Sequence, residues 1–363
     1  MAMNKGTKVV EDDGTKLRPA VLVPTLMGLF KARQNVLLKG HPGVGKTDMV
    51  KQAAEGIGFD LSISHPVTAD PTDYKGMPAI LKTGRAEFLP FGDLRKLMEA
   101  TRPMVFFLDD LGQAAPSVQA AAMQLLLARE INGQKISDHV TFAAATNYKS
   151  DKAGVSGILE PVKSRFATIL GVAPSADDWV QWARGNRMPG ELIGYILWRP
   201  GSLMAFEPTA DIVNTPSPRT VAQLGRLLSL SNQAGEKDDA KIPADGLYAM
   251  MEGAVGRGFA TEFMAYLRVF ASLPDPDQVL NNPQAFKKLL SDPSKPDVTA
   301  AICVALGDRV SIAQMPKLLE VSECLPSHDF LVLMLSVIKS RGPEYVQTKT
   351  YREFIIKHTN MMV

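Results

Sequence analysis

The sequence predicts an α/β fold, in which a parallel sheet carries a phosphate-binding loop and a helical region follows. Three observations predict this fold. A glycine-rich segment, Gly40 to Thr47, separates a short apolar run from a stretch with helical periodicity. A second apolar run ends in Asp109 and Asp110, and a third ends just before Asn147. Continuous apolar runs are typical of strands that are buried on both faces, as in parallel sheets covered by helices.

The glycine-rich segment fits the pattern G-x-x-x-x-G-K-[ST]. Its residues are Gly40, His41, Pro42, Gly43, Val44, Gly45, Lys46 and Thr47. Residues 35–39 before it form an apolar strand, and the residues after it have helical spacing, so the context is that of a phosphate-binding loop. Glycines let the backbone wrap closely around an anion, and the helix start adds positive potential. We expect Lys46 to reach the β- and γ-phosphates of ATP and Thr47 to bind Mg²⁺, as in P-loop NTPases.

Polar side chains follow two of the apolar runs. Residues 104–108 read as a buried central strand, and Asp109 and Asp110 come directly after it. Because ligands bind at the carboxyl ends of strands in open α/β sheets, Asp109 is expected to bind Mg²⁺. Asp110 is expected to orient or deprotonate the attacking water. Asn147 ends the strand at 141–146 and is predicted to hydrogen-bond the γ-phosphate or that water; its alternative is a turn-forming role.

The composition is that of a globular protein with a sizeable core. The chain has 363 residues, of which 45% are hydrophobic and 21% charged, and its net charge is +2. This balance gives no reason to expect nucleic acid or an anionic membrane as a partner. No apolar stretch is long enough to span a bilayer, and no signal peptide is recognised, so a cytoplasmic location is expected. Cys303 and Cys324 have no metal or redox spacing and are expected to be reduced and buried.

Further strands, hairpins and helix starts can be placed along the chain. Strands are expected at 35–39, 59–63, 104–108, 141–146 and 167–170, with hairpins around Thr83-Gly84 and Asn132-Gly133. A helix is expected over 20–30, either continuous or broken at Pro24. Predicted helix starts are Asp93 as a cap, Pro116 in a first turn, Ser175 in a capping box, and Ser217 as N-cap before Pro218. Residues 231–242 read as a polar linker, and the chain beyond them reads as helical.

With these residues collected, the chain resembles AAA+ ATPases of the MoxR type. Gly40 to Thr47 matches the Walker A loop of that family, residues 106–110 its Walker B strand, and Asn147 its sensor 1 residue. The resemblance implies that Arg165 is the arginine finger, with Lys163 as a second candidate, and that Arg219 belongs to sensor 2. Residues 70–91 are similar to the helix 2 insertion of the family, and the Asn132-Gly133 hairpin to its hairpin before sensor 1.

The resemblance covers residues 18–235, and the expected domains follow from it together with the pattern of elements along the chain. These are a flexible N-terminal tail (1–17), an AAA+ core (18–172), an α-helical lid (173–235) and an α-helical C-terminal domain (236–363). An arginine in the first turn of a helix opposes the helix dipole, so Arg219 is expected to have a partner outside its helix, such as phosphate.

The resemblance implies a homo-oligomeric ring, expected to be hexameric, that hydrolyses ATP with Mg²⁺. Asp110, Asn147, Arg165 and Arg219 would serve hydrolysis. The partner would be a protein that is remodelled, activated or matured in a chaperone-like way, for instance one with a von Willebrand factor A domain.

The family normally has Glu after the Walker B Asp, where this chain has Asp110. The shorter carboxylate changes its reach to the water, and misplacement on this scale can cost about a hundredfold in rate. Two alternatives therefore stay open: an ATP-dependent assembly switch or scaffold with little hydrolysis, and the ATPase subunit of a metal chelatase. A DNA-processing motor is disfavoured by the balanced charge.

Overall fold

The computed structural model describes residues 14–151, 154, 157–209, 211–234 and 243–358. The chain divides into two units, Met1–Ala173 and Pro174–Val363, which are described separately below. The predicted tail spans residues 1–17. Residues 1–13 of it lie outside the described residues, whereas Lys16 and Leu17 form a short edge strand.

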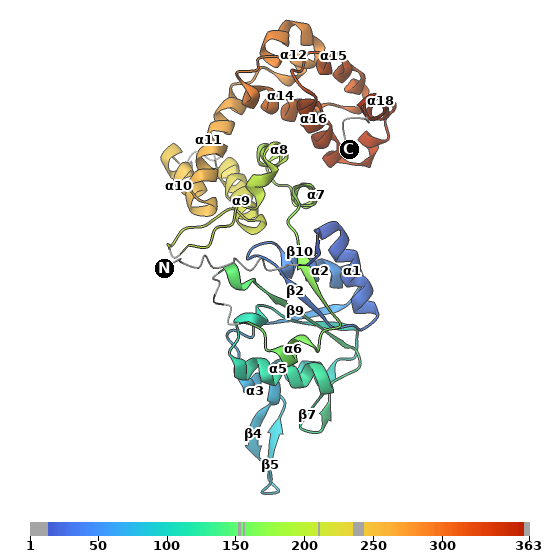
Figure 1. Ribbon diagram of the computed structural model, residues 1–363, viewed down its shortest axis with the longest axis vertical. Helices are drawn as coiled ribbons and strands as arrows, with labels where there is room; N and C mark the ends of the chain where they lie inside the picture. The colour runs from blue at the N-terminus through green and yellow to red at the C-terminus, as the bar shows by residue number, and fades with distance from the viewer. Residues whose placement is uncertain (1–13, 152–153, 155–156, 210, 235–242, 359–363) are drawn as a thin grey trace, which may run out of the picture. The chain divides into compact units, whose positions relative to one another are not determined.

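The first unit is built on a six-stranded sheet with the order β1-β10-β2-β9-β6-β3 (Figure 1). All neighbouring strands in it pair in parallel. The strands are β1 (Lys16–Leu17), β2 (Val36–Lys39), β3 (Asp60–Ser64), β6 (Met104–Leu108), β9 (Val140–Thr146) and β10 (Thr168–Val172). The five strands predicted from apolar runs all lie in this sheet. The predicted α/β fold with a parallel sheet is thereby confirmed.

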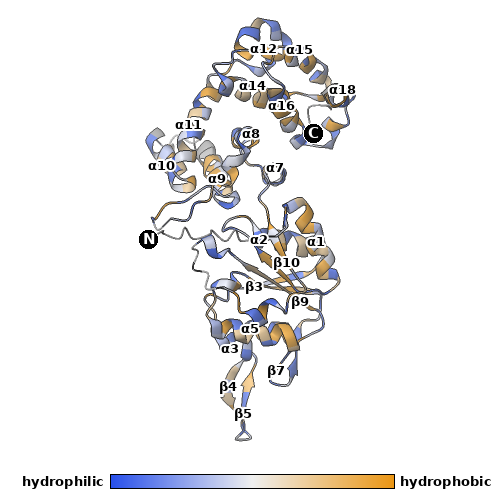
Figure 2. Ribbon diagram, viewed as in Figure 1, coloured by the Kyte–Doolittle hydropathy of each residue, from blue (hydrophilic) through white to orange (hydrophobic). Residues whose placement is uncertain are grey.

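Helices cover both faces of the sheet because its strands carry apolar side chains on both. Their bounds are α1 (Pro19–Lys31), α2 (Lys46–Gly56), α3 (Pro71–Lys75), α4 (Gly92–Glu99), α5 (Pro116–Ala128) and α6 (Glu160–Lys163), with 3-10 turns η1 (Leu111–Gln113) and η2 (Lys149–Asp151). Helices α1 and α2 share a core with Val36 and Leu38, whereas α4 and α5 share one with Leu37. This alternation along β2 follows from the period of two in a strand. The apolar colour of the strands in Figure 2 is consistent with this two-sided burial.

Helix α1 is continuous although Pro24 lies inside it. Of the two open alternatives, the structure therefore contains the unbroken helix. The predicted cap of α4 is wrong, because Phe91 occupies the N-cap position. Asp93 instead lies in the first turn and pairs with Lys96 at 2.8 Å. A carboxylate at either position stabilises the helix, since both positions lie at its positive end.

Two hairpins extend from the sheet. Strand β4 (Met77–Ile80) pairs antiparallel with β5 (Ala86–Leu89), and β7 (Glu130–Ile131) pairs with β8 (Gln134–Lys135). Both bends are where the sequence predicted them. The Nδ2 of Asn132 donates to the backbone oxygen of Lys75 at 2.7 Å, which ties the second hairpin to the segment just before β4.

The second unit is helical. Its elements are α7 (Ala176–Gly185), α8 (Gly190–Trp198), η3 (Pro200–Leu203), α9 (Pro218–Ala234), α10 (Ala244–Val255), α11 (Arg257–Ala271), α12 (Pro276–Asn281), η5 (Pro283–Phe286), α13 (Lys287–Leu290), α14 (Pro296–Arg309), η6 (Ile312–Lys317), α15 (Leu318–Ser322), α16 (His328–Arg341), α17 (Pro343–Val346) and α18 (Lys349–His358). Helices α7 to α11 share one apolar core, and α12 to α18 contribute to another. Residues 235–242, most of the predicted linker, lie outside the described residues.

Both predicted helix caps in this unit are present. The Ser175 Oγ accepts from the amide of Asp178, and the Ser217 Oγ accepts from the amide of Thr220. Cys303 and Cys324 are buried and not disulfide-bonded, as expected. Burial raises the pKa of the Cys303 thiol to about 12, so this thiol stays protonated at neutral pH.

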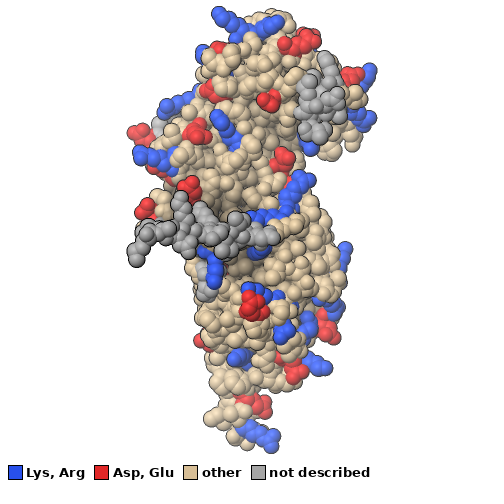
Figure 3. Space-filling model, viewed as in Figure 1, with Lys and Arg blue, Asp and Glu red and all other residues tan. Residues whose placement is uncertain are grey.

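Among the residues described, no helix combines the length and apolarity needed to cross a membrane. On the face of the molecule shown in Figure 3, Lys and Arg side chains are interspersed with Asp and Glu. This mixture agrees with the near-zero net charge of the chain.

Candidate nucleotide site

The glycine-rich loop connects β2 to α2 at the carboxyl edge of the sheet. Gly43 and Gly45 have φ of 75° and 100°, a region that residues with a Cβ rarely adopt. A Cβ at Gly40 would lie 3.1 Å from the Cβ of Val172 and 3.3 Å from Cγ1 of Val44. The loop geometry therefore requires glycine at these positions, as expected for a loop that wraps around a phosphate.

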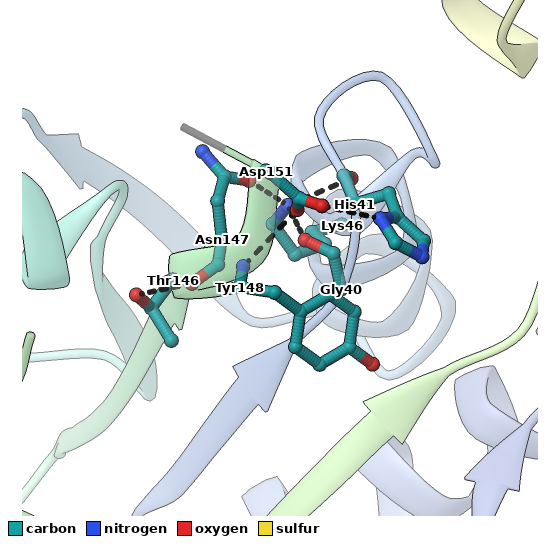
Figure 4. Close-up of polar contacts among 7 residues, drawn as sticks. All are labelled: Gly40, His41, Lys46, Thr146, Asn147, Tyr148 and Asp151. Atoms are coloured by element: carbon teal, nitrogen blue, oxygen red, sulfur yellow. Dashed lines mark hydrogen bonds and ion pairs between the residues drawn. The ribbon is translucent and has the colours of Figure 1, made fainter. Parts of the chain in front are cut away.

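Lys46 is held on the inner side of this loop. Its side chain is buried, and its Nζ donates to the backbone oxygens of Gly40 and His41 at 2.8 and 3.1 Å. A third contact reaches Oδ1 of Asn147 at 2.6 Å (Figure 4). The ammonium group is thus fixed between the loop and the tip of β9.

Thr47 and Asp109 form the second contact across the edge. The Thr47 hydroxyl donates to Oδ2 of Asp109 at 2.7 Å, and Oδ1 of Asp109 accepts from the amide of Asp110 at 3.1 Å. Asp109 is itself largely buried, and its amide donates to the oxygen of Ser64 at the end of β3. A hydroxyl beside a carboxylate is a hard oxygen pair that fits Mg²⁺, which takes few protein ligands and completes its shell with phosphate and water.

In the described part of the chain, no group of three or more His, Cys, Asp or Glu could hold a metal ion.

Asn147 and Asp110 lie side by side at the same edge. The Nδ2 of Asn147 donates to Oδ1 of Asp110 at 3.2 Å, while its Oδ1 accepts from Lys46. Asp110 has φ 57° and ψ 34°, the left-handed region. A short polar residue such as Asp adopts this region more readily than a longer side chain does. The backbone here thus suits the aspartate that departs from the family pattern.

Within the described residues of the first unit, Arg165 does not join this network, and Arg219 belongs to the second unit. Arg165 follows α6 and is half-buried, and its Nε is a buried donor with no hydrogen-bond partner within the described residues. Lys163, the second finger candidate, pairs with Glu160 at 2.5 Å. Arg219 is exposed in the first turn of α9, in the second unit.

His41 makes contacts that the motif alone does not predict. Its Nδ1 lies 2.8 Å from Oδ1 of Asp151, and its ring meets the ring of Tyr148 edge-on at 4.8 Å (Figure 4). Asp151 and Tyr148 are both buried, and the sequence reasoning did not select either of them. Asp151 could have been selected from its position in the sequence, because a carboxylate shortly after a predicted strand end lies at the ligand-binding edge of the sheet.

Comparisons with known proteins agree with this geometry. Residues 36–173 match the family model described as "ATPase family associated with various cellular activities (AAA)". Over 102 residues the chain is 29% identical to protein MoxR of Methylorubrum extorquens. That alignment covers 28% of this chain and spans 29% of the length of MoxR.

Solved structures give more distant likenesses. A Thermotoga maritima RuvB P216G mutant is 14% identical with a TM-score of 0.42, over 78% of this chain and 86% of that one. A putative ATPase from Cytophaga hutchinsonii is 11% identical with a TM-score of 0.32, over 95% and 89%.

The sheet, the loop and the matched family model define the first unit as an AAA ATPase domain. The similarity to MoxR over 102 residues supports the expected MoxR type.

Proposed function

We propose that the chain binds ATP with Mg²⁺ at the carboxyl edge of the sheet and hydrolyses it. Residues 40–47 would hold the triphosphate, with Lys46 at the β- and γ-phosphates. Thr47 and Asp109 would hold Mg²⁺, which when bound neutralises charge that develops on the phosphate oxygens. Asp110 and Asn147 would orient the attacking water, and the Asp110 carboxylate would accept its proton.

The observation that carries this proposal is the hydrogen-bonded chain from Lys46 through Asn147 to Asp110. The side-chain amide of Asn147 accepts from Nζ of Lys46 at 2.6 Å and donates to Oδ1 of Asp110 at 3.2 Å. Groups that must act on one γ-phosphate and one water are therefore held together before any ligand binds. Such preorganisation supports catalysis because the groups need not rearrange during the reaction.

We propose further that hydrolysis requires a ring of identical subunits, expected to be hexameric. Arg165 would act on the γ-phosphate of the neighbouring subunit, and its place outside the hydrogen-bonded group of Lys46, Asn147 and Asp110 in its own chain supports this role. Arg219 would connect the helical lid (173–235) to the nucleotide state, and residues 236–363 would form the C-terminal domain, whose first helices α10 and α11 share the apolar core of α7 to α9.

The proposed client is a protein in the cytoplasm, for instance one with a von Willebrand factor A domain, which the ring would remodel, activate or mature. The β4–β5 hairpin supports a protein partner, because Ile80, Met77 and Phe88 on it are 81, 54 and 44% exposed. Clustered exposed apolar side chains of this kind often mark protein interaction sites.

The test is the specific ATPase activity as a function of protein concentration. We expect it to rise as subunits assemble and to fall by roughly 10³-fold in Arg165→Ala, the effect typical of an arginine finger. A specific activity independent of concentration, or full activity in Arg165→Ala, would exclude the proposed action in trans.

A second candidate function is an assembly switch that binds ATP with little turnover. The feature that favours it is Asp110, which is shorter than the Glu of the family and held in the left-handed region. Negligible turnover in the presence of tight ATP binding and ATP-dependent assembly would favour the switch over the ATPase.

A further inference from the structure

Four contacts join the phosphate loop to the last residue of β9 and the segment that follows it. The amide of Gly40 donates to the oxygen of Thr146 at 3.2 Å, and Lys46 donates to Asn147. Further along, the His41 ring meets the Tyr148 ring edge-on, and its Nδ1 pairs with Asp151 (Figure 4). The last two contacts depend on the side chain of His41. They lie beyond Asn147, so they fix the far side of the segment that carries it.

The partner of His41 is a buried carboxylate. The Asp151 side chain is 3% exposed, whereas that of His41 is 34% exposed. A buried carboxylate is costly unless it is hydrogen-bonded, and Asp151 meets this need with both oxygens. Oδ1 pairs with His41, and Oδ2 accepts from the amide of Tyr148 at 3.2 Å. Asp151 thereby joins His41 to the residue directly after Asn147.

The position of Asn147 is sensitive to this arrangement. Its amide group must contact Lys46 with one end and Asp110 with the other, at 2.6 and 3.2 Å. A hydrogen bond weakens steeply with small changes in distance and angle, so a shift of the segment would lose one of the two contacts. Neither His41 nor Asp151 needs to touch ATP for this effect.

We propose that His41 and Asp151 are positioning residues: their pair holds Asn147 in the place where it can act on the γ-phosphate and the water. This inference rests on the proposed hydrolysis of ATP. Loss of the pair lowers the turnover number, while ATP affinity changes little because the backbone amides of the loop, Lys46 and Thr47 are all retained, and His41 contributes its backbone to the loop.

The experiment measures kcat by steady-state ATP hydrolysis and Kd by calorimetry with a slowly hydrolysed ATP analogue, on the full chain with Mg²⁺. The variants are His41→Ala, Asp151→Asn and the double variant, with His65→Ala as a control at an exposed histidine. Each single variant is expected to lower kcat by about 10- to 100-fold, the range for a catalytic group that is misplaced by about an ångström. Kd is expected to stay within about threefold, and the double variant to be no slower than the singles, as for residues that act together.

A conservative variant separates this role from a general loss of structure. His41→Asn places an Nδ2 donor the same number of bonds from Cα as Nδ1 of histidine, so it can still donate to Asp151. Its kcat is expected to lie between those of His41→Ala and the wild type.

Full turnover in His41→Ala, or additive losses in the double variant, would overturn the inference. So would a loss in His41→Ala that appears in Kd alone. An inactive wild type would instead contradict the proposed hydrolysis, so the two failures are distinguishable.

Discussion

Asp110 combines a departure from the family pattern with an unusual backbone. Its φ of 57° lies in the left-handed region, and its carboxylate accepts from Asn147. A glutamate would adopt this backbone less readily, because the left-handed region costs about 1–2 kcal/mol for residues other than Gly, Asn and Asp. The left-handed backbone at this position therefore suits an aspartate.

We expect Asp110→Asn to lower the hydrolysis rate by roughly 100-fold or more while ATP binding is retained, because the amide keeps the shape but cannot accept the proton. Asp110→Glu is expected to give no gain in rate, since the longer side chain meets the same backbone. Steady-state hydrolysis measures both, with Asp93→Asn on the exposed face of α4 as a control. Full activity in Asp110→Asn would show that another group accepts the proton.

At the scale of elements, the helices that pack on the sheet have buried apolar side chains, whereas the β4–β5 hairpin exposes its own. Leu97 on α4 is 1% exposed and packs in the core below the sheet, whereas Ile80 on β4 is 81% exposed. The hairpin strands pair with each other alone in the sheets of the described residues. The hairpin is therefore expected to contribute little to the stability of the first unit.

Leu97→Ala is expected to destabilise the first unit by about 2–5 kcal/mol, because it leaves a cavity in the core. Ile80→Ser is expected to change stability by less than about 0.5 kcal/mol, as is usual for exposed positions. Hydrogen exchange of peptides from α4 and β6 measures the stability of the first unit. Tryptophan fluorescence would not, since all three tryptophans lie in the second unit. Equal protection losses in the two variants would contradict this assignment.

The sheet could be predicted because its strands are continuous apolar runs that end in polar residues. Strand β1 could not, since two residues at a sheet edge carry no periodic signal. One local motif predicted the loop with Lys46 and Thr47, and the end of one apolar run predicted Asp109. The pair of His41 and Asp151 could not be predicted, because it joins residues 110 positions apart whose contact depends on how β2 and β9 are paired.

At the scale of the whole molecule, each site is expected to take one residue, Arg165, from a neighbouring subunit. The groups that contact one another in a single chain are Lys46, Thr47, Asp109, Asp110 and Asn147. Arg165 is outside this network, so hydrolysis is expected to need a second chain.

Mixing two inactive variants tests this division. Lys46→Ala lacks the phosphate-binding cation and Arg165→Ala lacks the finger, so each alone is expected to be inactive. In a mixed ring, the intact loop of one variant meets the intact arginine of the other, and hydrolysis is expected to return. A mixture no more active than its components would contradict a shared site.

The most direct test of the central claim is calorimetric titration of the chain with a slowly hydrolysed ATP analogue and Mg²⁺. The wild type is expected to bind the analogue saturably, and Lys46→Ala is expected to bind it with an affinity roughly 10- to 100-fold lower, as for loss of charged hydrogen bonds. Lys51→Ala, at an exposed position of the same helix α2, should bind like the wild type. Absence of binding to the wild type, or equal affinity in Lys46→Ala, would contradict the nucleotide site.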